Sequence, residues 1–339
     1  MTDVQASRPR IALVLGDPAG IGPELVARLL ARDATRDAAD VLLIADEAEV
    51  AAGMQVAGET FGYVCVDTPE LARRFRNGVV LLRCGTRPEA GFRRGESSAE
   101  AGRYSLETLR AALDAVQAGI ADAIVFAPLN KHSLHLGGMR TSDELHWFAR
   151  QLAFEGPVCE FNVLGKLWTS RVTSHVALKD VAGLVTPEGV MQGIELLAAA
   201  IRASGVAAPR IAVCGLNPHN GDSGSFGREE LDVIGPAVIG ARLRGLAVEG
   251  PFAADTIFLR VQGDRPAYDG VVTMYHDQGQ IAMKLMGFSR GVTVQGGLPF
   301  PITTPAHGTA FDITGQGRAD GSAMQMAFDL ACRTSAARR

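Results

Sequence analysis

The sequence predicts an α/β fold built on mostly parallel sheets. Short apolar runs alternate with amphipathic helical patterns along the whole chain, which is typical of a parallel sheet covered by helices. With 339 residues, the chain is long enough for about two domains of roughly 150 residues each. No stretch of the chain has the composition of a linker, so we expect two α/β/α lobes joined by shared strands rather than two separate domains.

The expected elements follow one another in a regular order. The run RIALVL predicts a first strand at 10–15, and Pro23 suits the first turn of a helix over 23–31. Alanines and leucines at helical spacing predict a long helix over 99–118. Further strands are expected at 41–45, 79–82, 123–127, 158–164, 167–173, 211–214 and 270–274, and further helices at 143–152, 187–203 and 228–243.

Composition narrows the class of protein. Lysine and arginine number 33 against 37 aspartates and glutamates, a net charge of −4, which argues against a nucleic-acid partner. No apolar run reaches the roughly 18 residues of a membrane span, and residues 1–10 lack the apolar core of a signal peptide. The five cysteines are scattered and form no C-x-x-C pair, as expected of reduced thiols. We therefore expect a soluble cytoplasmic enzyme without a membrane or nucleic-acid partner.

Reactive side chains follow four of the apolar runs. In open α/β sheets, ligands bind beyond the carboxyl ends of the strands. A single histidine at a strand end is more often structural, but three imidazoles with an open fourth position can hold a catalytic divalent metal. Gaps of 44 and 57 residues separate the three histidines, so no local spacing supports this site. The side chains that follow the four runs are Lys131, His175, His219 and His276 with Asp277.

Two glycine-rich stretches are candidate cofactor-binding segments. The turn over 16–24, GDPAGIGPE, lacks the last glycine of G-x-G-x-x-G and the lysine of a phosphate loop, so it is equally well a plain tight turn. The stretch over 307–317, HGTAFDITGQG, offers backbone donors and one carboxylate, Asp312. It is either a surface loop or a cradle for a nucleotide, with Asp312 placed for ribose hydroxyls.

These segments carry a resemblance to a known family. GDPAGIGPE, APLNK, GLNPHNGDSGSFG, AADTIF, YHDQG, KLMGF, GLPF and HGTAFDITGQG occur in this order. With them the chain resembles the 4-hydroxythreonine-4-phosphate dehydrogenase (PdxA) family over about residues 10–332. The resemblance implies a two-lobed fold like that of the isocitrate and isopropylmalate dehydrogenases. It also implies a metal- and NAD(P)-dependent oxidoreductase that oxidises a CH–OH group of a hydroxy acid or diol and often decarboxylates the product.

The resemblance further implies how the chain is assembled. It implies a homodimer with shared active sites, in which a divalent ion (Zn, Mg, Mn or Co) is held by His175, His219 and His276, the last from the partner. An outer lobe would comprise 1–131 with 310–339, and a central lobe, 132–309, would carry the metal histidines and the dimer interface. The likeness of HGTAFDITGQG to a nucleotide-binding loop favours the cradle, so the residues expected to bind NAD or NADP are His307, Gly308, Thr309, Ala310 and Asp312.

Three further side chains are candidates for catalysis. Lys131 could act as general acid–base if burial lowers its pKa. Asp277 could orient the imidazole of His276 or accept a proton, although a turn cap is an alternative role for it. Lys284, eight residues after His276, is expected to neutralise a substrate carboxylate.

The chain departs from the family where its members contact a substrate phosphate. Asp143-Glu144-Leu145-His146 stands in place of Gly-His-Thr-Glu, Thr293 in place of asparagine, and Ile302 in place of arginine. A carboxylate about 5 Å from a phosphate would cost roughly 3 kcal/mol at an effective dielectric of 20. We therefore expect a substrate that is not a phosphate ester, for example a cis-dihydrodiol carboxylate of the terephthalate type. Alternatively, Asp143 and Glu144 are solvated helix caps. The expected substrate-binding residues are Asp143, Glu144, Lys284, Thr293 and Ile302.

Two other classes of protein remain open at this point. A hydrolase or lyase could use the same three-histidine metal without a nucleotide, and a binding module would need no reactive strand ends. No G-x-S-x-G motif occurs, which argues against a serine hydrolase.

Overall fold

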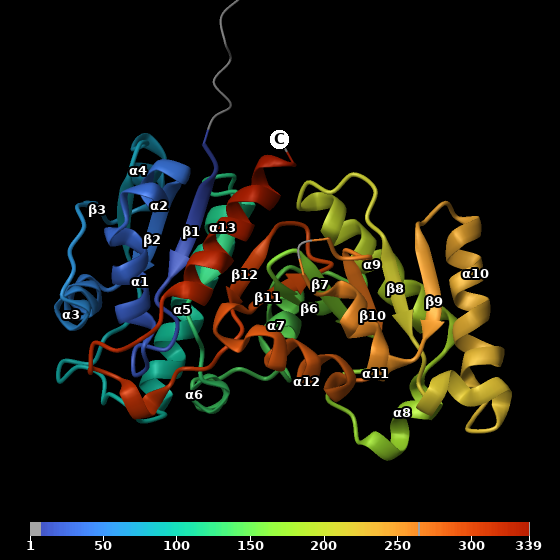
Figure 1. Cartoon of the computed structure of the whole chain (residues 1–339). Helices are drawn as coiled ribbons and strands as arrows, with labels where there is room; N and C mark the ends of the chain where they lie inside the picture. The colour runs from blue at the N-terminus through green and yellow to red at the C-terminus, as the bar shows by residue number, and fades with distance from the viewer. Residues whose placement is uncertain (1–7, 264, 339) are drawn as a thin grey trace, which may run out of the picture. The chain divides into compact units, whose positions relative to one another are not determined.

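The computed structural model describes residues 8–263 and 265–338 and divides into two compact units (Figure 1). Residues 1–154 and 298–339 belong to the first unit, and residues 155–297 form the second. The predicted divisions, after Lys131 and after Thr309, therefore differ from the observed ones, because helix α6 packs on α5 of the first unit. Residues 1–7, part of the segment in which no signal peptide is expected, lie outside the described residues.

The first unit contains a fully parallel sheet with strand order β3-β4-β2-β1-β5-β12. β1 lies in its middle with every residue buried, because RIALV is apolar after its first residue and both faces of the strand are covered. Ile11 pairs with Val41 of β2 and with Ala123 of β5. The strands are β1 (Arg10–Val14), β2 (Asp40–Ala45), β3 (Val64–Val66), β4 (Val79–Arg83), β5 (Ala123–Phe126) and β12 (Ile302–Pro305).

Helices connect these strands and cover the sheet. The long helix α5 packs on β1 and β5, and the last helix, α13, packs on β12 and β5, as the ribbons in Figure 1 show. The helices of this unit are α1 (Gly22–Ala31), α2 (Asp33–Ala38), α3 (Glu47–Ala57), α4 (Pro69–Arg74), α5 (Ala99–Gln117), α6 (Lys131–Leu136), α7 (Glu144–Gln151) and α13 (Ser322–Ala336), with a 3₁₀ turn at Phe311–Ile313.

The second unit contains a mixed sheet with strand order β11-β6-β7-β10-β8-β9. β6 runs antiparallel to both of its neighbours, whereas β7, β10, β8 and β9 are mutually parallel. The predicted α/β class with mostly parallel strands is therefore confirmed. The strands are β6 (Cys159–Leu164), β7 (Leu167–Arg171), β8 (Ile211–Cys214), β9 (Val248–Phe252), β10 (Gly270–Thr273) and β11 (Val292–Gly296).

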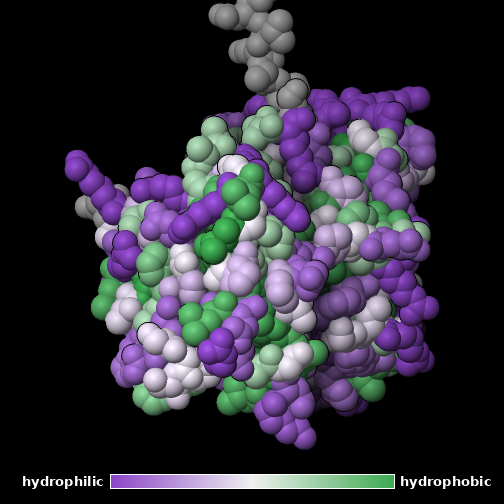
Figure 2. All heavy atoms as spheres, turned by 90° about the vertical axis from the view of Figure 1, so that its right-hand side faces the viewer, coloured by the Kyte–Doolittle hydropathy of each residue, from purple (hydrophilic) through white to green (hydrophobic). Residues whose placement is uncertain are grey.

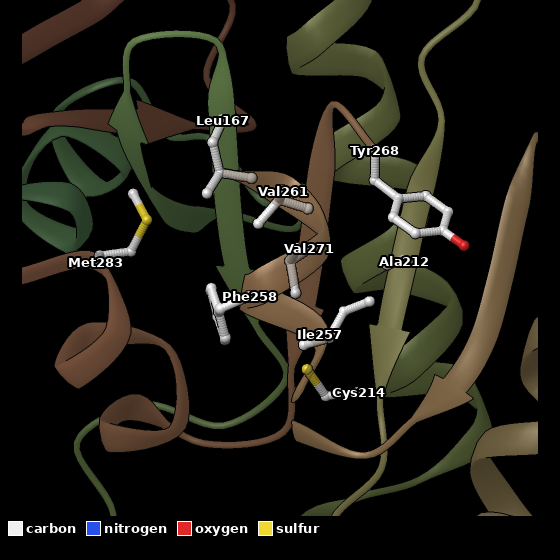
Figure 3. Packing of buried hydrophobic residues seen from close by; sticks show 9 residues of the cluster. All are labelled: Leu167, Ala212, Cys214, Ile257, Phe258, Val261, Tyr268, Val271 and Met283. Atoms are coloured by element: carbon white, nitrogen blue, oxygen red, sulfur yellow. The ribbon is translucent and has the colours of Figure 1, made fainter. Parts of the chain in front are cut away.

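A cluster of buried apolar residues joins the parallel strands of this unit to the helices beside them (Figure 3). Leu167, Ala212 and Val271 come from three neighbouring strands, and Phe258 and Met283 from two helices that pack on them. Burial of each such side chain contributes on the order of 1.5–3 kcal/mol, so this cluster fixes the strands whose ends carry the histidines. The helices are α8 (Leu178–Leu184), α9 (Pro187–Ala203), α10 (Gly235–Leu243), α11 (Ala254–Ile257) and α12 (His276–Gly287), with 3₁₀ turns at Pro218–Gly224, Phe258–Val261 and Phe288–Arg290.

The helix predicted over 228–243 contains a change of geometry. Residues Glu230–Ile234 form one π-helical turn, and a regular helix follows from Gly235. Pro236 lies in this helical stretch and has no N–H to donate to the turn before it, which accounts for the wider turn at that point.

No single helix within residues 8–263 and 265–338 is long and apolar enough to cross a membrane. Helices α8 and α9 meet that criterion only when they are taken together, across a bend of 92°.

Helices α5 and α6 approach each other through two glycines. A Cβ atom at Gly102 would lie 1.8 Å from the carbonyl oxygen of Ser133, and one at Gly137 would lie 2.3 Å from the backbone of Gly102. Only glycine permits this approach. Because α6 begins at Lys131, the contact also sets the position of that residue.

We expect Gly102→Ala to destabilise the protein by about 1–3 kcal/mol, because the added methyl group must push α6 away from α5. The measurement is the thermal melting temperature followed by circular dichroism. The control is Gly183→Ala in α8, where no atom lies within 4 Å of the added Cβ. An unchanged melting temperature for Gly102→Ala would show that the two helices can separate without cost.

Candidate active site

Three neighbouring strands of the second unit end at one edge of the sheet. β10 lies between β7 and β8, and its register pairs Thr273 with Arg171 and Val272 with Val213. Because the three strands are parallel, the segments that follow them start from the same edge. These segments carry the three histidines that the sequence singled out.

His175 and His276 lie together within one chain. Their ring centroids are 5.9 Å apart, with the ring planes inclined by 39°. His276 is the first residue of α12, and its Nδ1 lies 2.7 Å from Oδ1 of Asp277. A carboxylate on one ring nitrogen fixes the orientation of the imidazole and leaves the other nitrogen for a metal ion or a substrate. Asp277 is therefore placed to orient His276, as predicted for it.

His219 opens a run of left-handed backbone. The φ angles of residues 219–223 are 52°, 60°, 77°, 44° and 56°, and only the third residue, Gly221, is a glycine. Left-handed geometry costs roughly 1–2 kcal/mol for each residue that has a Cβ. Such local strain persists only where surrounding contacts hold it, and it is found most often at functional sites. The exposed ring of His219 has a neighbour in Phe226, at a centroid distance of 6.3 Å.

The contacts that hold this run come from Glu230, a buried residue. Its Oε1 accepts hydrogen bonds from the backbone amides of Leu216 and Asn217, both at 2.7 Å. Its Oε2 accepts a third from Nδ2 of Asn217 at 3.0 Å. Burial raises the pKa of the Glu230 carboxyl, but the hydrogen bonds from Asn217 and Leu216 outweigh it, so the pKa lies below its usual value.

Gln278 connects the His219 segment to the start of α12. Its Nε2 donates to the carbonyl oxygen of Gly215 at 2.8 Å, and its Oε1 accepts from the backbone N–H of Met274 at 2.7 Å. Gly215 follows β8 and Met274 follows β10. The segments that carry His219 and His276 are thus joined by one side chain.

The donor set suits a divalent ion, although one chain does not assemble all of it. In the part of the chain that the structure describes, no group of three or more histidine, cysteine, aspartate or glutamate side chains is placed to hold a metal ion. The pair His175 and His276 has the side-chain chemistry of zinc and other transition-metal ligands, and Asp277 supplies the outer hydrogen bond that such ligands usually have. Of the three predicted ligands, the single chain therefore brings together His175 and its own His276, whereas the family resemblance implied that His276 would come from the partner subunit.

A buried arginine lies beside the segment that carries His175. Arg171 donates from Nε to Oγ of Ser174 at 2.9 Å, from Nη1 to Oδ1 of Asn162 at 2.9 Å, and from Nη2 to Oε1 of Glu160 at 2.7 Å. Asn162 in turn donates from Nδ2 to the hydroxyl of Thr293 at 3.3 Å. Thr293 is 8% exposed, so its side chain belongs to this internal network.

The two glycine-rich stretches of the first unit lie against each other. The backbone N–H of Ile21 donates to the carbonyl oxygen of Thr309 at 3.1 Å, and a Cβ at Gly20 would lie 2.8 Å from the Thr309 side chain. Ala310 has a φ of 45°, so the backbone changes direction directly after this contact. The turn is therefore more than a plain tight turn, because it supports the loop that is a candidate nucleotide cradle. Asp312 is exposed on that loop.

Glu24 and Arg28, both on α1, fasten the far end of the same loop. Nη2 of Arg28 donates to the carbonyl oxygen of Gly317 at 2.7 Å, and Oε1 of the buried Glu24 accepts from the backbone N–H of Ala319 at 2.9 Å. Glu24 also suits the dipole of α1, because it is an acidic side chain in the first turn of the helix. Its contact with residue 319 could not be deduced from a separation of 295 residues.

Two of three further predicted site residues, Lys131 and Ile302, occupy surroundings that differ from the expectation. Lys131 is exposed at the start of α6, so the burial that its predicted acid–base role requires is absent in the described chain. Lys284 is exposed on α12. Ile302 is 0% exposed within β12, where it pairs with Ile124 of β5, so it is a core residue rather than a surface that touches substrate.

Asp143 is a helix cap. Its Oδ1 accepts from the backbone N–H of His146 at 2.9 Å and lies 2.6 Å from Nδ1 of the same residue, while Oδ2 accepts from Oγ of Ser142 at 3.2 Å. Burial raises the pKa of the Asp143 carboxyl, but the hydrogen bonds and the charge of His146 outweigh it and leave the pKa below its usual value. The structure thus supports the alternative in which this helix start is capped, with the carboxylate buried rather than solvated.

We expect Asp143→Ala to lower stability by about 0.5–2 kcal/mol at neutral pH, because the first turn of α7 loses its cap. The folded-state pKa lies below the reference value of 3.8, so this contribution is present above pH 3.8 and is lost as the pH falls through the folded pKa. Thermal melts of the wild type and the variant should therefore converge below pH 3.8. Asp143→Asn, which keeps a capping oxygen, is the control. A melting difference that does not change between pH 3 and 7 would contradict the assignment.

Comparison with known proteins supplies the family. The family model described as "Pyridoxal phosphate biosynthetic protein PdxA" matches residues 37–331. A protein of Pseudomonas aeruginosa named "Putative 4-hydroxythreonine-4-phosphate dehydrogenase 2" is 63% identical over 328 residues, 96% of this chain and 97% of that protein.

Two solved structures bear on the fold and on the alternatives. The 4-hydroxythreonine-4-phosphate dehydrogenase of Klebsiella pneumoniae matches with a TM-score of 0.83 and 33% identity, over 98% of this chain and 99% of that chain. The terephthalate 1,2-cis-dihydrodiol dehydrogenase of Burkholderia xenovorans LB400 matches with a TM-score of 0.64 and 26% identity, over 94% and 95%. These relatives are named dehydrogenases, the class of enzyme that the motifs predict. The chain belongs to the PdxA family, as its motifs indicated.

Proposed function

We propose that this protein is a divalent-metal-dependent, NAD(P)-dependent dehydrogenase that oxidises a hydroxyl group of a hydroxy acid or diol. The observation that carries the proposal is the set of three histidine-bearing segments at the ends of three neighbouring parallel strands. The named activity of the relatives agrees with it.

His175, His219 and His276 would hold the ion. When bound, a divalent ion supplies Lewis acidity, which lowers the pKa of a substrate hydroxyl. Asp277 keeps the imidazole of His276 in one orientation through its contact with Nδ1. Lys284 would neutralise a substrate carboxylate, and Lys131 would exchange a proton with the substrate once binding removes it from water.

NAD or NADP would bind at the loop of residues 307–317. The contact between Ile21 and Thr309 and the fastening of Gly317 by Arg28 support this proposal, because they hold the loop at both ends. His307, Gly308 and Ala310, on either side of Thr309, would offer backbone groups, and Asp312, between the two points, would offer a carboxylate for the ribose hydroxyls.

We propose a homodimer in which the two subunits share each active site. Helix α12 carries exposed apolar side chains one turn apart, Ile281 at 60% and Leu285 at 85% exposure, and such a stripe is typical of a helix that packs against a partner. Helix α10 carries a similar exposed pair, Ile239 at 57% and Leu243 at 85%, and hydrophobic and hydrophilic residues are interspersed on the face shown in Figure 2. His276 begins α12 and lies beside His175 of its own chain, so sharing of the site would require the His276 ring to turn toward the second subunit when that subunit packs on α12.

The substrate is proposed to lack a phosphate ester. Support comes from Thr293, which is bound within the Asn162 network, and from Ile302, which is buried at the position where the family resemblance implies an arginine. The carboxylate of Asp143 caps α7, so it gives no support for or against a phosphate ester. A cis-dihydrodiol carboxylate is the second candidate, favoured by the likeness to the terephthalate dihydrodiol dehydrogenase.

The test is NAD(P)H formation, read by absorbance, with a panel of hydroxy acids, dihydrodiol carboxylates and 4-hydroxythreonine-4-phosphate. We expect turnover of a carboxylate substrate, complete loss after chelation and recovery when a divalent ion is added back. Released CO₂ would show whether decarboxylation follows. Turnover that survives chelation would contradict the metal assignment, and turnover of the phosphate ester alone would contradict the substrate. Metal-dependent hydrolysis without nucleotide binding would indicate a three-histidine hydrolase or lyase instead.

The shared site predicts which inactive variants complement each other. Mixed dimers of His175→Ala and His276→Ala should regain about half of wild-type activity, because one of the two sites then has all three histidines. Mixed dimers of His175→Ala and His219→Ala are the matched control and should stay inactive, since both residues are proposed to serve the same subunit's site. The reverse pattern, or no recovery in either pair, would contradict the proposed sharing.

A further inference from the structure

We infer that Glu230 is the residue that sets the position of His219, and that it acts by holding the strained backbone from which His219 projects. The inference deepens the proposed function, on which it rests for the role of His219 as a metal ligand. The sequence interpretation assigned no role to Glu230.

The placement of Glu230 is unusual for a carboxylate. It is 3% exposed and lies in the π-helical turn that precedes α10, yet it makes no ion pair among those found in the described residues. All three of its hydrogen bonds to the strand-end segment go to Leu216 and Asn217. A buried charge stays ionised only where such donors compensate its lost hydration.

These contacts fix both sides of His219. On one side, Asn217 is held by its backbone amide and by its side chain, two residues before His219. On the other side, Oε2 of Glu230 packs against Gly221, where a Cβ would lie only 2.6 Å away. The carboxylate therefore contacts the chain on both sides of His219.

Other hydrogen bonds also reach the run and the residues beside it. Asn220 N–H donates to the Asn217 carbonyl oxygen at 3.2 Å, Ser225 N–H to the Asp222 carbonyl oxygen at 3.1 Å, and Phe226 N–H to the Gly221 carbonyl oxygen at 3.1 Å. The side chain of Asn217 also donates to Oε2 of Glu229 at 2.6 Å. The backbone bonds lie within the loop itself, whereas the buried Glu230 carboxylate contacts the loop on both sides of His219 from the helical turn that follows. Loss of the carboxylate should release the run and move the His219 imidazole, since functional geometry depends on such supporting contacts.

The experiment compares Glu230→Ala with Glu230→Gln and with a matched control. Glutamine keeps one oxygen able to accept the two backbone hydrogen bonds, so Glu230→Gln should resemble the wild type more closely than Glu230→Ala. The control is Asp232→Ala. This variant also removes a carboxylate from the same helical turn, but that carboxylate pairs with the exposed Arg228. Gly221→Ala, at a φ of +77° and with its Cβ 2.6 Å from Oε2 of Glu230, offers a second way to disturb the run, because it displaces the Glu230 carboxylate without removing it.

Two readouts do not depend on activity. Hydrogen exchange of the metal-free protein should be faster in residues 215–227 in Glu230→Ala, but unchanged in Asp232→Ala. The affinity of metal-free protein for Zn²⁺, measured by competition with a chelating dye, should fall about 10–100-fold in Glu230→Ala and in Gly221→Ala. NAD⁺ binding and melting temperature, measured on the same samples, identify a variant that is simply unfolded. If Glu230→Ala is unfolded, the hydrogen exchange and Zn²⁺ affinity of Glu230→Gln and Gly221→Ala test the role of Glu230 instead.

His219→Ala distinguishes a failure of the proposed metal site from a failure of the proposed role of Glu230. If His219→Ala binds Zn²⁺ as tightly as the wild type does, the proposed metal site is wrong. If His219→Ala loses affinity while Glu230→Ala and Gly221→Ala keep both wild-type affinity and wild-type exchange, the proposed function stands and the role of Glu230 is refuted.

Discussion

The parallel pairing of β7, β10 and β8 is the constraint on which the rest of the site depends. Parallel strands end at the same edge, so the three segments that follow them leave from neighbouring positions whatever their separation in the sequence. The cluster around Val271 and Ala212 holds these strands in register. Residues that lie 44 and 57 positions apart in the chain thus become candidates for one site.

Packing of the strands does not, however, fix the segments beyond their ends. Each of these segments is held by a charged or polar side chain that is buried or partly buried and that bonds to backbone groups or to neighbouring side chains. Glu230 holds the His219 segment, Arg171 contacts the turn before His175, and Gln278 joins the segments of His219 and His276. In the first unit, Glu24 and Arg28 hold the glycine-rich loop in the same manner. Because an unpaired buried polar group is costly, each contact also favours one arrangement of its loop over others.

The sequence predicted the elements well where periodicity was strong, and it placed three histidines shortly after buried strands. The strand over 211–214 and the helix over 187–203 agree with the structure at both ends. It failed where long-range packing decides. The close approach of α6 to α5 moved the division between the units, and β12 was not predicted, so Ile302 was taken for a substrate residue instead of a core residue. The left-handed run after Pro218 has no reliable sequence signal beyond its Asn, Gly and Asp residues. Asp143 could have been assigned as a cap, since an aspartate before an amphipathic helix is a known start signal.

The central claim is that three strand-end histidines form one divalent-metal site shared by two subunits. Anomalous diffraction from crystals of the dimer grown with Zn²⁺ tests this claim most directly. The account predicts one strong peak per subunit, within bonding distance of the imidazoles of His175 and His219 and of the partner's His276. A peak at other side chains, or the absence of any peak at these histidines in a crystal that binds Zn²⁺ elsewhere, would contradict it.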